Sequence, residues 1–415
     1  MPKDKIITGI DIGSTKVNTT IAAVSENKVS VIGVSGEIPS KGINKGNVVD
    51  IDSSVEAIAN SLERAERMAG VSVHSAFVTI NGSHINTLNS HGVVAVSPNE
   101  NSEISHEDVV RVIDAAKAVS LPSTREIIHV IPRDFVVDAQ EGIKDPVGMS
   151  GVRLEVETNI IHGSATAAKN IIKCIDQVGV AVEELVYVGI ASSEAVLTDT
   201  EKELGTMLVD IGGGTTATIA FIDGSPVHST VLPIGGKLIT SDLAIGLRAK
   251  LEDAERIKLD LSIKAKVSKD KSDEDEFDLS HYGLEMDSAP KSVLQGIIDA
   301  RLKEIFELVS LEMSKADLYK KLPAGIVLTG GAAHTVGIER SAKTILKLPV
   351  RVGTPKGVTG LVDEIQGVSS AAAVGAIMYG ANLYKEGSLL SLDDKNGNIG
   401  KSVSKFFGKL KSFLP

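Results

Sequence analysis

The 415-residue chain contains a single cysteine, no tryptophan and few aromatic residues of any kind. Aromatic residues make up 3% of the sequence, so its cores must be built from aliphatic side chains. Cys174 has no disulfide partner within the chain, which favours a reducing compartment. Because this thiol lies in a helical pattern of apolar residues, we expect it in the core rather than at an active site.

The signatures of several common protein classes are also missing. No CxxC or HExxH pattern predicts a zinc site, and neither GxxxxGK[ST] nor GxGxxG predicts a P-loop or dinucleotide site. No run of eighteen apolar residues predicts a membrane span, and MPKDKIITG lacks the apolar region of a signal peptide. The net charge of −11 argues against a nucleic-acid-binding protein. We therefore expect a cytoplasmic protein of two or more domains.

The sequence does contain a glycine-rich turn between two apolar runs, LVDIGGGTTATIAFI at residues 208–222. Asp210 stands at the end of the first run, and the residues of the turn are Gly212, Gly213, Gly214 and Thr215. Glycines let backbone N–H groups approach phosphate oxygens closely, and a carboxylate suits a hard cation or its waters. This stretch predicts one phosphate-binding turn.

A second copy of this pattern, ITGIDIGSTKVNTTIA, lies at residues 7–22. The corresponding residues are Asp11, Gly13, Ser14, Thr15 and Lys16. Such a repeat predicts two related halves that close on one ligand. The alternative is that both turns are ordinary structural hairpins.

Three further stretches are candidates for the nucleoside part of such a ligand. IVLTGG predicts a buried strand that ends at Gly330 and Gly331, followed by Ala332, and Gly235 with Gly236 precedes a helical run. Glu255 and Lys258 lie three residues apart on one helix face. They are either a surface ion pair or polar contacts to a ribose.

Residues 84–162 differ from the flanking sequence in their pattern of strand-like and helical runs, and this pattern predicts a small inserted α+β subdomain. In this segment strand-like runs surround one helix, residues 105–118, which Ser105 begins with a capping-box pattern. An earlier helix, after residue 50, is expected to be capped by Asp52 or Ser53.

The end of the sequence combines a polar stretch, 387–400, with a basic amphipathic pattern, 401–415. We expect a flexible linker and then a helix that lies on an anionic membrane surface. The alternative is a helix that docks on the protein's own core. The apolar face would hold Val403, Phe406, Phe407, Leu410, Phe413 and Leu414, and the basic face Lys401, Lys405 and Lys409.

These motifs resemble the superfamily of actin, sugar kinases and heat-shock chaperones, and within it the FtsA family of bacterial cell-division proteins. The resemblance covers nearly the whole chain. It is carried by the stretches GIDIGSTKV, REIIHVIPRDF, EGIKDPVGMSGVRLEVE, VDIGGGTT, SDLAIGL, AERIK, LTGGAA and the terminal amphipathic pattern.

The resemblance implies an α/β fold with two actin-like lobes, which are duplicated ribonuclease-H-like halves, and with the inserted subdomain and the C-terminal amphipathic helix. The first lobe would be 1–83 with 163–205, and the second 206–386 with a smaller subdomain at 237–320. ATP would lie between the lobes. Asp11 and Asp210 would hold Mg²⁺ mostly through water, Glu255 and Lys258 would contact the adenosine, and Gly330 with Gly331 would lie beneath it.

It also implies an actin-like filament that holds the tubulin-like protein FtsZ at the inner membrane through the terminal helix. The FtsZ tail would bind the smaller subdomain, for which Arg301 and Lys303 are candidate contacts. The inserted subdomain would contact neighbouring subunits and other division proteins. The connecting helix begins Ala191-Ser-Ser, and its Glu194 is the remaining candidate catalytic group, so we expect slow ATP hydrolysis or none.

Two alternatives stay open from the sequence. A pilus-assembly protein similar to PilM would share the fold and the inserted subdomain, but not the terminal amphipathic pattern. A phosphotransferase of the sugar-kinase type would need a catalytic aspartate beside the γ-phosphate, and none is identified.

Overall fold

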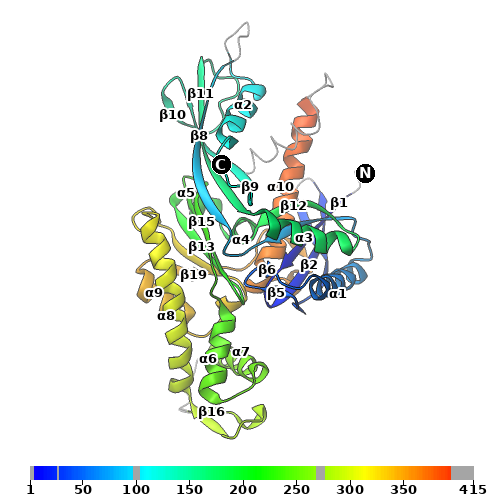
Figure 1. Ribbon diagram of the computed structural model, residues 1–415, viewed down its shortest axis with the longest axis vertical. Helices are drawn as coiled ribbons and strands as arrows, with labels where there is room; N and C mark the ends of the chain where they lie inside the picture. The colour runs from blue at the N-terminus through cyan, green and yellow to red at the C-terminus, as the bar shows by residue number, and fades with distance from the viewer. Residues whose placement is uncertain (1–3, 26–27, 97–102, 268–275, 394–415) are drawn as a thin grey trace.

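A computed structural model describes residues 4–25, 28–96, 103–267 and 276–393 of the chain. The molecule is elongated, with the inserted subdomain at one end and the smaller subdomain of the second lobe at the other (Figure 1). No helix in these described ranges is both long and apolar enough to cross a bilayer. The predicted terminal amphipathic helix, 401–415, lies outside the described residues.

The first lobe is built on a mixed sheet with the order β12-β7-β1-β2-β3-β20, in which β4 also pairs with β2. Helices α1 and α3 pack on this sheet and on each other. The elements are β1 (Lys5–Ile12), β2 (Lys16–Ser25), β3 (Lys28–Val34), β4 (Ile38–Pro39), α1 (Ile51–Ala69), β7 (Ser75–Ile80), α3 (Ala165–Gln177), β12 (Ala181–Tyr187) and β20 (Thr359–Gly360), with the small ribbon β5 (Ile43–Asn44) and β6 (Asn47–Val48).

The second lobe repeats this plan around a sheet with the order β15-β14-β13-β18-β19. Its elements are α5 (Asp199–Leu204), β13 (Thr206–Ile211), β14 (Thr216–Ile222), β15 (Ser225–Leu232), β18 (Gly325–Thr329), α9 (Ile338–Leu346) and β19 (Val350–Val352). In both lobes an antiparallel hairpin lies beside a parallel strand, since β1 pairs with β7 as β13 pairs with β18. The predicted duplication of two strand–turn–strand units is therefore confirmed.

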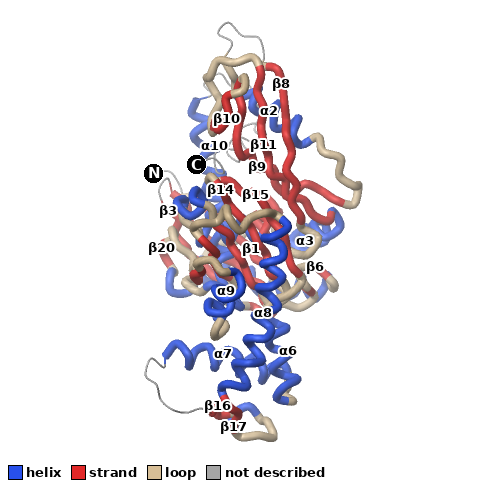
Figure 2. The backbone as a smooth tube through the Cα atoms, turned by 90° about the vertical axis from the view of Figure 1, so that its left-hand side faces the viewer, coloured by secondary structure: helices blue, strands red, loops and turns tan. Residues whose placement is uncertain are grey.

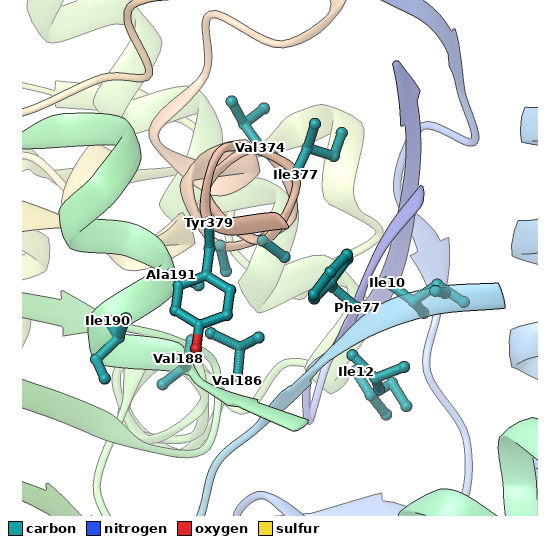
Figure 3. Close-up of a cluster of buried hydrophobic side chains, with 14 of the residues drawn as sticks. Ile10, Ile12, Phe77, Val186, Val188, Ile190, Ala191, Val374, Ile377 and Tyr379 are labelled. Carbon is teal, nitrogen blue, oxygen red and sulfur yellow. The ribbon is translucent and has the colours of Figure 1, made fainter. Parts of the chain in front are cut away.

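Two helices join the lobes. The connecting helix α4 (Val188–Val196) follows the first sheet, and α10 (Ala371–Asp393) packs against α4, β1 and β7. Figure 3 shows α10 end on, with Ile377 and Val374 on one side and Tyr379 directed toward α4 and β12. Helix α10 reaches Asp393, so residues 387–393 are helical where a linker is expected. This stretch holds one glycine and no proline, and a single glycine costs a helix only about 1 kcal/mol.

The inserted subdomain is a four-stranded antiparallel sheet, β10-β9-β11-β8, covered by one helix (Figure 2). It has its own small core, to which that helix contributes Val109, Val112 and Ile113. The predicted capping box is confirmed, because Ser105 and Asp108 exchange hydrogen bonds at the start of the helix. The elements are β8 (Asn86–Ala95), α2 (His106–Lys117), β9 (Arg125–Val137), β10 (Gln140–Ile143) and β11 (Arg153–Ser164).

The smaller subdomain of the second lobe is mainly helical and shares the core of that lobe. Its long helix α8 leads from the end of the molecule back to the second sheet (Figure 2). Its elements are α6 (Gly236–Leu247), α7 (Leu251–Val267), β16 (Glu276–Asp278), β17 (Ser288–Pro290) and α8 (Lys291–Lys315).

One predicted helix start is wrong. Helix α1 is capped by Asp50, whose side chain accepts hydrogen bonds from Ser53, rather than by Asp52 or Ser53. Asp50 has extended backbone angles, as an N-cap requires, whereas Ile51 is already helical. The carboxylate therefore binds the amide three residues later.

We predict that Gly375→Ala destabilises the protein by about 3 kcal/mol or more, because α10 and α4 are in backbone contact there. A Cβ at Gly375 would lie 1.6 Å from the carbonyl oxygen of Ala191. The matched control is Gly296→Ala in α8, where the added methyl meets no atom within 4 Å. This control should stabilise by about 0.5–1 kcal/mol. Urea unfolding of both variants measures the difference, and similar midpoints would contradict the described crossing.

Candidate functional site

The two glycine-rich turns face each other across the boundary between the lobes. Each turn is closed by the same hydrogen bond, from Gly13 N to Lys16 O and from Gly212 N to Thr215 O, both 2.9 Å long. A Cβ on Gly213 would lie 2.2 Å from Thr15 Cγ2, so only glycine permits this approach. The sequence repeat thus brings two matching turns into direct contact.

The start of helix α6 completes the second turn. The backbone N–H of Gly236 donates to Gly212 O at 2.9 Å, and that of Lys237 donates to Gly213 O at 2.8 Å. A Cβ on Gly235 would collide with the same two carbonyl oxygens. Lys237 also donates from Nζ to the carbonyl of Ser14 at 2.6 Å, which ties α6 to the turn of the other lobe.

Two carboxylates, one from each lobe, lie at the ends of β1 and β13 and line the same cavity. Thr79 Oγ1 donates to Asp11 Oδ1 at 2.7 Å, and Ser192 Oγ donates to Asp210 Oδ2 at 2.5 Å. Gly330, with φ +85°, leaves no room for a side chain, since its Cβ would lie 2.2 Å from Asp210 Oδ1. The backbone thus approaches the carboxylate of Asp210 from one side.

Burial raises the pKa of both carboxyl groups. For Asp210 the pKa is raised to about 6, mainly by burial and further by the negative charge of Asp11, against the hydrogen bond from Ser192. For Asp11, burial outweighs the hydrogen bond from Thr79 and the charge of Lys16. Two repelling carboxylates with raised pKa values at one cavity are a favourable setting for a divalent cation.

The cavity between the turns has a volume of about 60 Å³, so the cleft is closed. Of the predicted residues, it is lined by Asp11, Gly13, Ser14, Thr15, Lys16, Asp210, Gly212, Gly213, Thr215, Gly330 and Gly331. Gly214, Gly235, Gly236, Glu255, Lys258 and Ala332 are not among its lining residues.

The predicted lysine of the first turn is engaged within the protein. Lys16 Nζ lies 2.6 Å from Glu37 Oε1. Burial alone would raise the pKa of Glu37, but the charge and hydrogen bond of Lys16, with help from Ser369 and His334, lower it overall. Lys16 therefore lines the cavity while its ammonium group is paired with Glu37.

Glu255 and Lys258 share one face of α7, as predicted, and form an ion pair of 2.6 Å. Lys258 Nζ also donates to Thr240 Oγ1 at 3.0 Å, and Thr240 in turn binds Glu255. Lys258 is buried, with 7% of its surface exposed, so this is not an ordinary surface pair. The cluster joins α7 to α6, whose first residues support the second turn.

Glu194 is directed away from the turns. Its carboxylate accepts a hydrogen bond from Lys202 Nζ at 2.7 Å and another from Asn382 Nδ2 at 3.1 Å. This helix begins at Val188 rather than at the predicted Ala191, and in its middle Ser192, not an acidic residue, binds the carboxylate of Asp210. The connecting helix thus brings no carboxylate to the cavity within the described residues.

The two basic residues proposed for partner binding lie on α8. Arg301 makes a two-pronged contact with Asp242 of α6, at 2.6 and 2.9 Å, and also binds Glu304. Lys303 is exposed and lies 3.7 Å from Glu307. An acidic peptide would have to displace Asp242 from Arg301, whereas Lys303 is accessible.

Several polar residues at the site are absent from the sequence-based set. Asn81 lines the cavity and donates to Thr215 Oγ1 at 2.9 Å, which crosses between the lobes. Thr79, Ser192 and Lys237 bind predicted residues as described above, and Ser369 lines the cavity and binds Glu37. Asn81 could have been predicted from the sequence. It directly follows β7, which runs parallel to the strand that carries Asp11, and the carboxyl ends of parallel strands lie at the same edge of a sheet.

The two carboxylates and the glycine turns are suited to Mg²⁺ bound together with phosphate, and not to a metal ion whose ligands all come from the protein. Within the described ranges, no group of three or more His, Cys, Asp or Glu side chains is placed to hold a metal ion. Two carboxylates would leave the remaining positions of the cation to waters and phosphate oxygens, as is common for Mg²⁺. Glycine turns beside them offer backbone N–H groups for phosphates.

Comparison with protein families gives two matches. Residues 82–162 match the family described as "SHS2 domain inserted in FTSA", and residues 207–375 match the family "Cell division protein FtsA". The chain is 37% identical over 415 residues to the cell division protein FtsA of Pseudomonas aeruginosa, covering 99% of this chain and 97% of that protein. It is 36% identical over 420 residues to that of Escherichia coli K12, covering 99% and 97%.

Solved structures share the fold at low sequence identity. The PilM–PilN type IV pilus biogenesis complex contains a chain with a TM-score of 0.63 and 14% identity, covering 90% of this chain and 98% of that one. MreB5 of Spiroplasma citri bound to ADP gives a TM-score of 0.53 at 13% identity, covering 95% and 99%. These likenesses confirm the actin-like α/β architecture.

We predict that the free protein becomes less stable as the pH rises from 4 to 6, because Asp210 must ionise in the folded state. The pKa of Asp210 is about 6 in the folded state and 3.8 ordinarily, so between these pH values the folded state binds a proton that the unfolded state has released. The lost stability is on the order of 3 kcal/mol and stays lost above pH 6.

Asp210→Asn should remove this part of the pH dependence and raise the stability at pH 7. The control is Asp52→Asn, an exposed residue in the first turn of α1. Thermal unfolding in EDTA between pH 4 and 7 measures both variants. An unchanged profile for Asp210→Asn would show that the carboxylate is not strained in the free protein.

Proposed function

This chain belongs to the FtsA family of bacterial cell-division proteins, and we propose that it is an ATP-binding, filament-forming membrane tether for FtsZ. In this proposal it polymerises on the inner face of the cytoplasmic membrane and anchors FtsZ filaments there as the division ring assembles. The observation that carries the nucleotide part is the pair of facing glycine turns with one buried carboxylate from each lobe.

The residues at the cleft have separate parts in this proposal. Asp11 and Asp210 would accept hydrogen bonds from the waters of Mg²⁺, and the turns at 13–15 and 212–215 would donate backbone N–H groups to phosphates. The phosphates of bound MgATP would accept hydrogen bonds from the N–H groups of both turns, and its magnesium ion would balance the negative charge of both carboxylates. The Glu255–Lys258 pair would contact the adenosine, with Gly330 and Gly331 beneath it.

Nucleotide binding would act mainly on conformation. The two turns touch through Gly213 and Thr15, so the lobes must separate for phosphates to enter. A ligand held by both lobes then stabilises one relative orientation, which favours a filament contact. Glu194 is bound by Lys202 and Asn382, so we propose that hydrolysis is slow or absent and that ATP is chiefly a structural ligand.

The other parts of the proposal concern partners. The acidic tail of FtsZ would bind the smaller subdomain, 237–320, where Lys303 is accessible and Arg301 would exchange Asp242 for the peptide. The inserted subdomain would meet neighbouring subunits and other division proteins. The segment 401–415, which the structure does not describe, would lie on anionic lipid, so the protein would be peripheral at the division site.

We predict that Asp11→Asn and Asp210→Asn each weaken the Mg²⁺-dependent binding of ATP by about 10- to 100-fold, because each removes a charged acceptor for metal-bound water. Titration with a fluorescent ATP analogue, with Mg²⁺ and with EDTA, measures this. Glu194→Gln is the matched control and should change neither affinity nor phosphate release by more than about twofold. Loss of phosphate release in Glu194→Gln would instead make that residue catalytic.

We predict that the full chain sediments with liposomes that contain phosphatidylglycerol and that the chain ended after Gly400 does not. With MgATP, electron microscopy of the pellets should show rows of filaments on the lipid. Added FtsZ should sediment only with the full chain and liposomes. Equal sedimentation of the shortened chain, or binding to neutral phosphatidylcholine alone, would remove the anchor from the terminal segment.

A further inference from the structure

A cavity of about 530 Å³ lies where the inserted subdomain meets the second lobe. It shares no lining residue with the cleft between the glycine turns. Its walls come from β8 and β9 of the inserted sheet, from β14 and β15 of the second sheet and from the segment that follows α8. These elements lie together in both views (Figures 1 and 2). Its volume falls in the range of sites for small ligands.

The edge strands of two sheets line this cavity. Strand β8 is the last strand of the inserted sheet, and β15 is the last strand of the second sheet. The buried side chain of Asn159 bridges them, since its Nδ2 donates to Asn89 Oδ1 at 2.9 Å and to Val227 O at 3.2 Å. Asn89 also lines the cavity, and its side-chain amide nitrogen donates no hydrogen bond within the described ranges.

Arg133 of β9 lines the cavity and is unusual for a half-buried arginine. Its Nε is buried without a hydrogen-bond partner, and its guanidinium forms no ion pair within the described ranges. Burying a charged donor without a partner is costly, so such groups are normally paired. The planar guanidinium is suited to binding carboxylate or phosphate through two hydrogen bonds.

A second unpartnered group, His228 of β15, also lines the cavity. Its Nε2 is buried and has no hydrogen-bond partner. Burial lowers the pKa of His228, while Glu312 acts in the opposite direction. The ring is therefore neutral near pH 7 and has one N–H to donate.

The lining residues of the cavity carry positive charge, and no lining residue carries negative charge. No aspartate or glutamate is among its lining residues. Of the acidic groups nearby, Glu312 pairs with Lys315 at 2.6 Å and Asp134 with Lys144 at 3.1 Å. The exposed Asp223, whose carbonyl binds the same Lys144 Nζ as that of Arg133, forms no ion pair with Arg133. Lys321 also lines the cavity and pairs with the exposed Asp317. Arg133 is thus the charge that lacks a counter-ion.

The remaining lining side chains are mostly apolar. Leu88, Ile222, Val227, Ala316 and Leu318 cover the other surfaces. A hydrated inorganic ion would leave these surfaces wet, whereas an apolar group would bury them. The cavity therefore suits an anionic ligand with a small apolar part beside its charged end.

We propose that this junction cavity binds a carboxylate or phosphate carried on a short apolar body, with Arg133 as its counter-ion. Asn89 and His228 donate hydrogen bonds to the ligand, and the aliphatic residues enclose its body. The anion belongs either to a free small molecule or to an acidic side chain of a peptide that lies along the edge strands. Either ligand contacts both the inserted subdomain and the second lobe and stabilises their relative position.

The test uses the full chain and four defined probes in isothermal titration calorimetry. Hexanoate and its neutral counterpart hexanamide form the small-molecule arm. The blocked peptides acetyl-Leu-Glu-Leu-amide and acetyl-Leu-Gln-Leu-amide form the peptide arm. We expect at least one anionic probe to bind about tenfold or more tightly than its neutral counterpart, and Arg133→Met to abolish this difference.

Arg64→Met is the matched control, since Arg64 is an exposed arginine of α1 and should leave binding unchanged. Arg133→Met should also keep or raise the melting temperature of the free protein, because it removes an unpaired, half-buried charge. Binding in one arm only identifies whether the source is free or peptide-borne. The proposal is overturned if neither anion binds at 10 mM, if neutral and anionic probes bind alike, or if Arg133→Met lowers the melting temperature markedly.

Discussion

The burial of two carboxylates, Asp11 and Asp210, at one cavity is the constraint on which the rest of the site depends. Each lobe places one carboxylate at the end of its central strand, and the closed cleft brings both to one small cavity. Their raised pKa values show that the free protein carries the charge at a cost in free energy. A cation shared by the two lobes offsets this cost, which couples binding to the relative position of the lobes.

Close contacts around the cleft depend on positions without a side chain. Gly213 lets Thr15 approach, Gly330 lets the backbone reach Asp210, and Gly375 lets α10 cross α4 in backbone contact. Each of these positions would place a Cβ within 2.2 Å of another atom. Gly213 thus meets a side chain of the other lobe, Gly330 meets a carboxylate of its own lobe, and Gly375 meets the backbone of α4.

Specific polar contacts join the lobes and subdomains. Lys237 holds the carbonyl of Ser14, Asn81 binds Thr215, and Asn159 joins the inserted sheet to β15. Hydrogen bonds of this kind contribute about 1 kcal/mol each, which is enough to select an orientation and small enough for a ligand to change it. Arg133, in contrast, is a charged group beside such a boundary without an intramolecular partner.

The sequence alone was sufficient for the duplicated hairpins, the inserted subdomain and most residues of the cleft. The reason is that glycine, β-branched runs and capping residues act over a few neighbouring positions. Tertiary structure decided the rest, because partners distant in sequence compete for each polar side chain. Glu37 binds Lys16, Lys202 holds Glu194 away from the cleft, and Asp242 occupies Arg301. The pairing of Asn81 with Thr215, and the solitary position of Arg133, likewise depend on how the sheets of different subdomains meet.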